Sequence, residues 1–582
     1  MKIIYAGQDQ KKQRSLERLD DVIVLLHDNW DDYDYKTTFP TACRMKGQSV
    51  ELGSVRILFE GKMTSYEFLD KLVEKGWDGV FPVPEANYVS TPAALTFYEL
   101  IEGHLGFDSV INVAQTLCDA SYLTRLKDDS DALRLVTSPG FKRSLQRERG
   151  SIKAFLDGWK LFGREGISIG NQTFIFRSVK KELLKLDLKF VSKNPLPHDI
   201  NVLIGPNGVG KSQLLHQIVE YWLDDDPDSV RRVRFSTRPN LSQVIVVSYS
   251  PFELFPVDVS DDEKNDHELK DRGVYRYFGL RGRKKLITDS KRGSEKVTLN
   301  RQFPKTNAAN SLLDCLADDQ RYGGIKEWAN KVETMELVLR QAINFDHAAV
   351  VVSADTEVAD LFTSLDWLDD THIDGKLGDE DSDSDVVRFI PIASDRIDYL
   401  KLNALRKHVR DSKGIVFLKD GMPLHLSSGQ RLFSYIVVNI LGAIRRNSLV
   451  LVDEPELFLH PSLEIAFVRM LKSILTAYAS KALVATHSLV TVREIPRDCV
   501  HVFEDTQDGI VLKTPPFETF GGDVQRISSY VFGDKSLSKP YEEWVSQKLE
   551  EFGSADGLID ALGKNINEEL LIQINAMENR KW

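Results

Sequence analysis

A short glycine-rich segment places the strongest constraint on how this chain folds. Its sequence, Gly205-Pro-Asn-Gly-Val-Gly-Lys-Ser212, follows the apolar run Ile200–Ile204 and precedes apolar residues at helical spacing. Glycines let backbone N–H groups turn around an anion without Cβ clashes, and the dipole of the following helix favours negative charge. The order of strand, glycine loop and helix therefore predicts an α/β fold with a phosphate-binding loop.

The side chains of this loop have distinct expected roles. Lys211 is expected to reach the β- and γ-phosphates of ATP, and Ser212 is expected to ligate Mg²⁺. The full set of expected nucleotide contacts in the loop is Gly205, Pro206, Asn207, Gly208, Val209, Gly210, Lys211 and Ser212. The structural alternative is a glycine turn that binds no ligand.

A second segment, Ser448-Leu-Val-Leu-Val-Asp453-Glu454-Pro, is an apolar strand that ends in two carboxylates. The carboxyl ends of parallel strands meet at one edge of a sheet, so both side chains are expected beside the phosphate loop. Asp453 would hold Mg²⁺ through water, and Glu454 would orient and deprotonate the attacking water. The alternative is a strand that ends in acidic residues for structural reasons alone.

Two further motifs stand before and after this strand. Leu426-Ser-Ser-Gly-Gln430 opens a long apolar helical run. Its residues Ser427, Ser428, Gly429 and Gln430 form either a second anion-binding surface or only a helix cap. His487 follows the apolar run 482–485, where a lone histidine is usually structural.

Together the four motifs resemble one ATPase cassette of the ABC type, over about residues 170–530. Residues 426–430 are similar to the family signature LSGGQ, with Ser428 in place of the first glycine. The resemblance implies that Ser427 and its neighbours contact the γ-phosphate held by an opposite subunit. It also implies that His487 senses the γ-phosphate. Gln243 heads another apolar strand, but it does not stand where the family has its Q-loop glutamine.

The residues after Asp453-Glu454 indicate which branch of the family the chain resembles. They read Pro455-Glu456-Leu-Phe-Leu-His460-Pro461, similar to soluble SMC-like, RecF-like and OLD-like ATPases, whereas transporter cassettes usually read DEPTSALD. Ser250-Pro-Phe and the segment 520–534 also look like PtuA-like ATPases of bacterial anti-phage systems, as in Septu and some retrons.

This resemblance implies an ATPase with ATP and Mg²⁺ as cofactors that forms a homodimer or a higher even oligomer. It would act as the sensor or regulator of a separate effector, a nuclease or toxin, with DNA or RNA as the cue. The alternatives are a RecF-like or SMC-like ATPase of DNA repair or chromosome maintenance and, less favoured, the ATPase subunit of a transporter.

The charge of the chain limits its contacts with nucleic acid and membrane. It has 75 Lys and Arg against 87 Asp and Glu, which gives a formal net charge of −12. Nucleic-acid binding would therefore need a local basic patch. No apolar run reaches the ~18–20 residues that span a bilayer, and the four cysteines show no metal-ligand spacing. We therefore expect a soluble, cytoplasmic protein without a membrane partner.

The chain is expected to divide into three parts. Residues 1–165 are typical of an α+β N-terminal domain, in which Thr91-Pro92 has the form of a helix start. Residues 170–535 would form the ATPase cassette, with a helical insertion at about 307–410. Residues 536–582 would form a helical C-terminal segment, whose apolar stripe either packs in a core or binds a partner.

Two charged features are open to either of two interpretations. The acidic stretch 369–385 is expected to be a solvated or disordered loop, with a carboxylate metal site as the alternative. Basic residues cluster in the stretches 231–238 and 281–292 and, on the N-terminal domain, in 142–149. The second cluster adjoins Tyr275, Tyr277 and Phe278, which favours nucleic acid over a solvated face.

Overall fold

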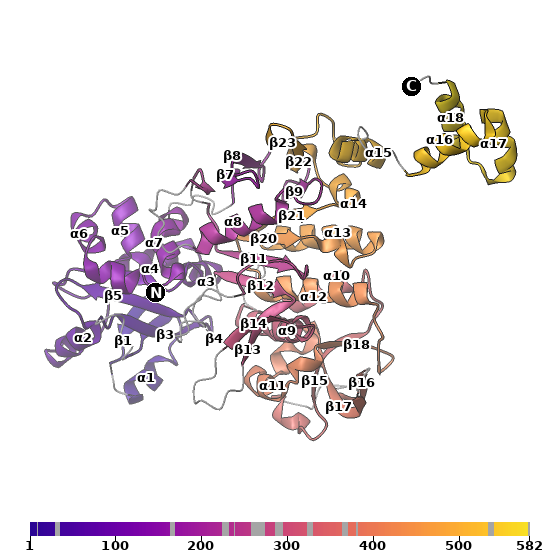
Figure 1. The fold of residues 1–582 in the computed structure, drawn as a ribbon. Helices are drawn as coiled ribbons and strands as arrows, with labels where there is room; N and C mark the ends of the chain where they lie inside the picture. Colours follow the sequence, from indigo (N-terminus) through magenta and orange to yellow (C-terminus); the bar gives the residue numbers. More distant parts are fainter. Residues whose placement is uncertain are drawn as a thin grey trace. The chain divides into compact units, whose positions relative to one another are not determined.

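The computed structural model describes residues 1–7, 10–28, 35–162, 169–223, 232–237, 239–257, 274–285, 295–322, 330–363, 371–379, 382–533 and 540–579 (Figure 1). Contacts divide the chain into two compact units, Met1–Gly522 and Asp523–Trp582. The expected end of the cassette, residue 535, lies beyond this division. In the described part, no helix is both long enough and apolar enough to cross a membrane.

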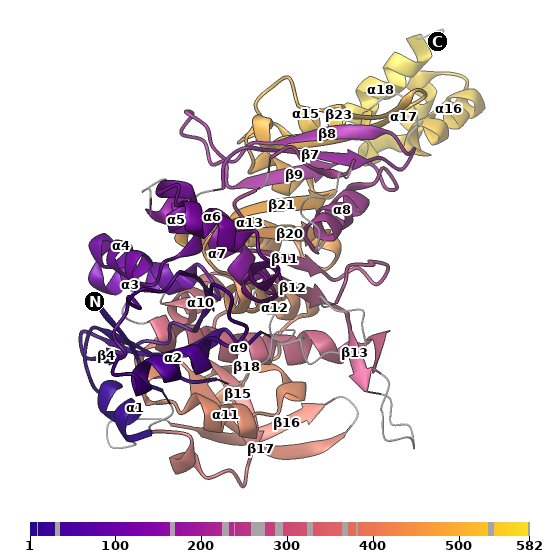
Figure 2. The ribbon, with the colours of Figure 1, turned by 90° about the vertical axis from the view of Figure 1, so that its left-hand side faces the viewer.

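The first unit contains a sheet in the order β12-β11-β20-β21-β9-β22-β23, whose strands lie one above another in Figure 2. Neighbouring strands are parallel except β22 and β23. In chain order its members are β9 (Ile200–Ile204), β11 (Gln243–Ser248), β12 (Tyr275–Gly279), β20 (Ser448–Asp453), β21 (Lys481–Thr486), β22 (Val500–Thr506) and β23 (Gly509–Lys513). The predicted α/β class is confirmed.

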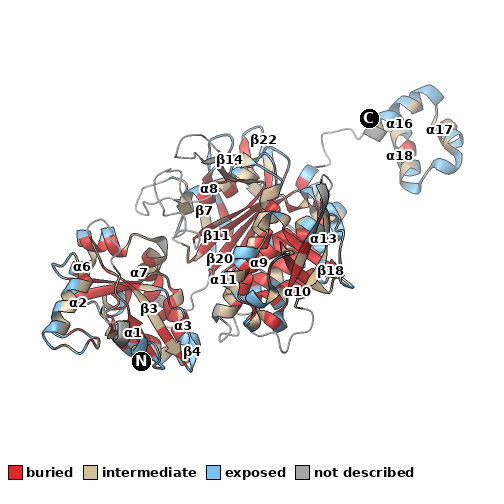
Figure 3. Cartoon of the chain, turned by 90° about the horizontal axis from the view of Figure 1, so that it is seen from below, coloured by how far each residue is buried: buried red, intermediate tan, exposed pale blue. Residues whose placement is uncertain are grey.

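This sheet forms the core of the unit because its central strands are apolar at almost every position. All residues of β9, β11 and β20 are buried, as expected when helices cover both faces of a parallel sheet (Figure 3). On one face, Leu214 and Ile218 of α8 (Lys211–Leu223) pack with Leu451 and Leu483. Helix α12 (Ser428–Ala443) contacts β11 and β12, and also α13 (Pro461–Ala477).

The N-terminal region has a sheet of its own, in the order β1-β2-β3-β5-β6, with β4 paired to β3. The strands are β1 (Lys2–Tyr5), β2 (Val22–Leu25), β3 (Thr38–Met45), β4 (Gln48–Ser49), β5 (Ser54–Phe59) and β6 (Tyr88–Pro92). The helices are α1 (Gln10–Leu16), α2 (Ser65–Glu74), α3 (Thr96–Leu105), α4 (Phe107–Thr116), α5 (Ala120–Leu126), α6 (Ser130–Val136) and α7 (Arg149–Phe162).

The helix start predicted at Thr91-Pro92 is wrong. Both residues end strand β6, and the next helix begins at Thr96. Strand β6 lies at the edge of its sheet, where a proline without an N–H group does not interrupt a hydrogen-bond ladder. The tertiary pairing of Val55 with Pro92 therefore outweighs the local helix signal.

A smaller antiparallel sheet combines two strands that precede the glycine loop with one that follows it. It has the order β10-β7-β8, formed by β7 (Gln172–Arg177), β8 (Leu183–Leu188) and β10 (Arg234–Phe235). Phe174 and Phe176 of β7 and Leu186 of β8 add to the core beneath α8.

The insertion is only partly helical, which corrects the expected helical insertion at about 307–410. It begins with α9 (Gln302–Tyr322) and α10 (Lys331–Leu339). A five-stranded sheet β16-β17-β15-β18-β19 then follows, with α11 (Leu402–His408) between β17 and β18. Its strands are β15 (His347–Ser353), β16 (Ile373–Asp379), β17 (Ser382–Ile392), β18 (Ile415–Lys419) and β19 (Met422–Pro423). Short apolar runs such as 348–352 fit helix and strand alike, and the β-branched valines favour the strand.

The described part of the acidic stretch is also a strand pair, where a loop was expected. Strands β16 and β17 pair antiparallel, and Asp374 lies opposite Arg388. Arg388 Nε donates to Asp374 Oδ1 at 2.6 Å. The apolar half of β17 sets the register because Val387 and Phe389 are buried with β15 and β18. Residues 369–370 and 380–381 lie outside the described part.

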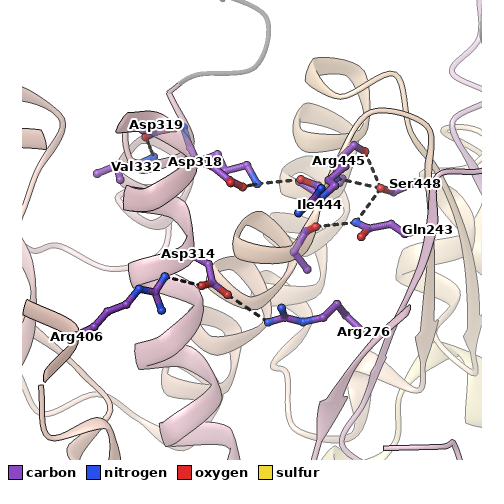
Figure 4. A network of polar contacts seen from close by, with 12 residues as sticks. Gln243, Arg276, Asp314, Asp318, Asp319, Val332, Arg406, Ile444, Arg445 and Ser448 are labelled. Atoms are coloured by element: carbon purple, nitrogen blue, oxygen red, sulfur yellow. Dashed lines mark hydrogen bonds and ion pairs between the residues drawn. The ribbon is translucent and has the colours of Figure 1, made fainter. Parts of the chain in front are cut away.

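Polar contacts fasten the insertion helices to the signature helix α12 (Figure 4). Buried Lys331 donates from Nζ to Asp318 Oδ2 at 2.7 Å and to the carbonyl of Ile444 at 2.8 Å, just past the end of α12. Asp319 accepts the backbone N–H groups of Lys331 and Val332 and thereby caps α10 from a different helix. The start of α10 and the end of α12 are therefore held by one cluster.

A second pair of contacts joins α9 to strand β12 and to helix α11. Asp314 accepts from Arg276 of β12 at 3.4 Å and from Arg406 of α11 at 2.8 Å (Figure 4). Helices α9 and α12 approach closely at Gly442, where an added Cβ would lie 2.5 Å from the carbonyl oxygen of Ser311. The insertion is thus packed directly against the cassette.

The second unit contains α15 (Val524–Ser528) and three further helices, α16 (Pro540–Phe552), α17 (Ala555–Leu562) and α18 (Glu568–Asn579). Val545, Ala555, Leu558 and Ile574 form their core. Within the predicted apolar stripe, Val545 is buried and Leu549 packs against the core, whereas Trp544 and Phe552 are exposed. Core packing therefore explains only part of this stripe.

Candidate nucleotide site

The glycine-rich loop joins β9 to α8 and has the backbone that a phosphate cradle requires. Gly208 and Gly210 have φ of 82° and 98°, a region that residues with a Cβ rarely occupy. At Gly205 an added Cβ would lie 2.5 Å from the carbonyl oxygen of Phe503. Residues 206–208 are exposed, whereas Val209 is buried. The loop thus presents its backbone to solvent while its base is packed on β22.

Lys211 turns back into this loop. Its Nζ donates to the carbonyl oxygens of Gly205 and Pro206, both at 3.0 Å, and lies 2.9 Å from His487 Nε2. Burial lowers the pKa of Lys211 to about 8, against the opposing effect of Glu454 and Asp453. The ammonium group is therefore held by weak backbone acceptors that phosphate oxygens could replace.

Ser212 and Asp453 meet across the sheet. Ser212 Oγ donates to Asp453 Oδ1 at 2.8 Å, and the parallel register sets Asp453 level with Ser248 and Ala485. Burial raises the pKa of Asp453 to about 7. A hydroxyl and a carboxylate are hard oxygen donors of the kind that Mg²⁺ takes together with phosphates and water. These two side chains therefore fit the expected magnesium site.

Glu454 follows the end of β20 in a left-handed conformation, with φ of 48° and ψ of 56°. Its backbone N–H donates to the carbonyl of Ala485 at 2.9 Å. Its Oε1 lies 3.5 Å from His487 Nε2, and the side chain remains about a quarter exposed. Strained backbone of this kind, held by neighbouring strands, is typical of functional sites.

His487 lies at the end of β21 and completes the cluster. Burial and the charge of Lys211 lower its pKa, so the neutral ring with Nε2 as acceptor matches the contact from Lys211. The structure thus brings together Lys211, Ser212, Asp453, Glu454 and His487, which come from three separate segments of the chain.

The motif 426–430 occupies the start of α12 as a complete capping box. Ser427 Oγ accepts the N–H of Gln430, and Gln430 Oε1 accepts the N–H of Ser427. Gly429 packs closely, since an added Cβ would lie 3.0 Å from the carbonyl oxygen of Phe458. Among the described residues, no hydrogen bond joins 427–430 to the glycine loop. Within one chain, the motif therefore acts as a helix cap.

Gln243 lies at the wrong end of its strand for a nucleotide contact. It pairs in register with Ser448, at the start of β20, whereas Ser248 pairs with Asp453 at the end. Its side chain is buried and donates to the carbonyl of Ala443 and to Ser448 Oγ (Figure 4). The site-facing end of β11 is thus Ser248, whose buried hydroxyl has no hydrogen-bond partner in the described part.

The structure contradicts the expected aromatic platform beside the second basic cluster. Tyr275, Tyr277 and Phe278 are all buried, so none can stack on a base. Arg281 donates to the carbonyls of Glu253 and Phe255, at 3.3 Å and 3.0 Å, and is used within the fold. Lys291 and Arg292, together with Arg231 and Arg238 of the first cluster, lie outside the described residues.

Glu456 lies near the site, although its sequence motif predicted no functional role for it. Its carboxylate accepts a hydrogen bond from the backbone N–H of His487. Burial raises the pKa of this carboxyl group. The signal in the sequence was its place two residues after Glu454, but the pairing with His487 depends on β20 and β21 being neighbours.

Comparisons with known proteins find similarities over different parts of this chain. Residues 353–493 match the family model described as an AAA domain, putative AbiEii toxin, Type IV TA system. Protein ea59 of Escherichia phage lambda is 24% identical over 568 residues, which cover 93% of this chain and 91% of that protein.

A solved structure, the SMC head domain from Thermotoga maritima, aligns with 60% of this chain and all of its own length, at 10% identity and a TM-score of 0.25. A TM-score this low does not establish a common fold. The family match contains Asp453, Glu454 and His487, and the glycine loop lies beside them in the same sheet. Residues 353–493 are therefore similar to an AAA-type domain, and the glycine loop, which lies outside the match, adjoins that segment in the sheet.

Proposed function

We propose that this protein binds and hydrolyses ATP at the site formed by the glycine loop, Asp453, Glu454 and His487. The observation that carries the proposal is the Ser212–Asp453 hydrogen bond of 2.8 Å, because it places the two expected magnesium ligands together beside a loop built for phosphates. When bound, Mg²⁺ would offset phosphate charge, with Ser212 and Asp453 as the side chains that hold it.

The chain's own residues supply the remaining chemistry. Backbone N–H groups of 207–212 and the Lys211 ammonium bind the phosphates. Glu454 accepts a proton from the attacking water, the water oxygen bonds to the γ-phosphorus, and the bond to the β–γ bridging oxygen breaks to leave ADP and phosphate. His487 contacts both Lys211 and Glu454, so it can sense whether the γ-phosphate is present.

We further propose that two copies assemble around two ATP molecules, as a homodimer or a higher even oligomer. The exposed start of α12 supports this proposal. Ser427 and Gln430 are exposed or half-buried and do not reach the glycine loop of their own chain, yet the helix N-terminus can bind an anion. An opposite copy is the natural source of that anion.

The biological role we propose is regulation of a separate effector, a nuclease or toxin, in anti-phage defence. The matched family model names a toxin of a toxin–antitoxin system, and the relative ea59 comes from a phage. A RecF-like or SMC-like role in DNA maintenance is the second candidate. A gene for a nuclease or toxin next to this one would favour the first role.

The test is steady-state phosphate release by the purified full chain with Mg²⁺ and ATP. Lys211→Ala should abolish nucleotide binding, and Glu454→Gln should retain it while slowing hydrolysis by about 10²–10⁴. Lys472→Ala is a matched control, because burial also lowers the pKa of half-buried Lys472 and its Nζ likewise donates to a backbone carbonyl. Unimpaired hydrolysis in Glu454→Gln would remove Glu454 from the proposed role.

A further inference from the structure

The loop after β20 holds His487 by two different carboxylates. Glu454 Oε1 lies 3.5 Å from the imidazole Nε2, and Glu456 Oε1 accepts the backbone N–H of the same residue. The two acidic residues flank Pro455, and the short 3₁₀ turn Pro455–Leu457 brings the second carboxylate back toward β21. One rigid turn thus contacts both the ring and the backbone of His487.

Burial of the Glu456 carboxylate lowers the free energy of unfolding. Its Oε2 is shut off from solvent and has no well-formed hydrogen bond among the described residues, although the side chain of Thr486 also favours the charged carboxylate and works to lower its pKa. A buried oxygen without a good hydrogen bond lowers the free energy of unfolding. A smaller apolar side chain would avoid this cost, so the position is not explained by stability alone.

We propose that Glu456 is a positioning residue for ATP hydrolysis, which fixes the backbone of His487 so that its ring meets Lys211 and Glu454. The inference rests on the proposed ATPase function. Glu456 makes no hydrogen bond to Lys211 or Ser212 among the described residues, and its hydrogen bond is to the backbone of His487. Its negative charge also works to raise the pKa values of Lys211 and Asp453. The required property is an acceptor oxygen and not a negative charge, because the partner is a backbone N–H.

The same turn continues toward the signature helix. Leu457 and Phe458 follow Glu456, and the carbonyl oxygen of Phe458 is the atom closest to the position of a Cβ on Gly429. The turn that holds His487 therefore also packs against the start of α12.

The experiment compares Glu456→Gln, Glu456→Ala, His487→Ala and the double variant Glu456→Ala/His487→Ala in the full-length protein. Glu456→Ala should lower kcat by about 10- to 100-fold with KM for ATP little changed, because misplacement affects the reacting geometry more than binding. Glu456→Gln keeps the acceptor and should stay within about threefold of the wild type. The double variant should be no slower than His487→Ala, since the two changes remove one interaction.

The matched control is Glu464→Ala, which removes a carboxylate that bonds to the side chain of the adjacent Ser488 and not to His487. Equal loss of kcat in this control, or additive losses in the double variant, would overturn the positioning role. Loss of activity in Glu456→Gln equal to that in Glu456→Ala would show that the charge is needed, which also contradicts it.

A second measurement tests the positioning role of Glu456 independently of ATP hydrolysis. Hydrogen exchange of a peptide that contains the amide of His487 should be faster in Glu456→Ala than in the wild type or in Glu456→Gln, because the alanine leaves that N–H without its acceptor. Unchanged exchange would refute the inference. Absence of any Lys211-dependent hydrolysis in the wild type would instead refute the proposed function, with the exchange result still standing on its own.

Discussion

The hydroxyl of Ser212 donates a 2.8 Å hydrogen bond to Oδ1 of Asp453, a residue 241 positions later in the chain. The contact exists because β20 and β9 both border β21 in a parallel sheet, so that their carboxyl ends share one edge. This hydrogen bond brings the glycine loop and the acidic strand end together in one site.

Replacing Asp453 should leave folding intact but abolish the Mg²⁺-dependent binding of ATP. We expect Asp453→Asn to leave the nucleotide-free protein at least as stable as the wild type, because burial already disfavours the charged carboxylate and raises its pKa to about 7. The rise in melting temperature caused by ATP with Mg²⁺ should disappear. Thermal-shift curves with Mg²⁺–ATP and with ATP plus EDTA measure this. A full Mg²⁺-dependent rise in the variant would place the metal elsewhere.

Assembly around ATP can be tested through the capping box of α12. Ser427→Arg removes the cap of α12, which costs about 1 kcal/mol, but the exposed position should let the chain fold and bind ATP while the bulk of arginine blocks ATP-dependent dimers at the proposed interface. Light scattering after size exclusion, with Glu454→Gln as background to retain ATP, measures the dimer. A mixture of chains with Lys211→Ala and Ser427→Arg should regain one complete site and partial hydrolysis. No recovery in that mixture would contradict the head-to-tail arrangement.

Stability should depend on pH through a buried histidine of β22. His501 Nε2 lies 2.9 Å from Asn201 Oδ1, and burial lowers the pKa of His501 to about 4. Below about pH 6.5 the unfolded chain binds a proton that the folded chain does not, so stability is lost as the pH falls from 6.5 toward 4. The loss from this group is about 2 kcal/mol at pH 5.

His501→Gln removes this titration, and the fall in melting temperature between pH 7 and pH 5 should be smaller in this variant than in the wild type. His425→Gln, at an exposed histidine, serves as the control and should follow the wild type. An equal fall in all three proteins would show that His501 does not govern the acid response.

Close packing of α9 on α12 should make Gly442 intolerant of a side chain. A Cβ at this position would lie 2.5 Å from the carbonyl oxygen of Ser311. Forcing the helices apart by overpacking costs about 1–3 kcal/mol, so Gly442→Ala should lower the melting temperature. Gly170→Ala adds a Cβ where no atom lies within 4 Å and is the matched control. Equal melting temperatures for the two variants would contradict the close approach.

Much of the site could be predicted because its signals are local. The glycine spacing of 205–212, the apolar strand before Asp453 and the serine cap at Ser427 each depend on residues within a few positions of one another. Steric freedom at glycine, burial of a parallel strand and capping of a helix act over that range. The sequence alone therefore determined the loop, the acidic strand end and the helix start.

Other features depended on pairings between distant segments, which local patterns do not encode. Only the register of β11 on β20 shows that Gln243 faces away from the site and that Ser248 faces it. The insertion contains a sheet only because β15 pairs with β17. Arg281 contacts the carbonyl of Phe255 only because the folded loop brings the two residues together. The hydrogen bond from the backbone N–H of His487 to Glu456 likewise depends on the pairing of distant segments. The sequence determined which groups carry the chemistry, and the tertiary structure decided which of them meet, because strand order and register arise from the packing of the whole core.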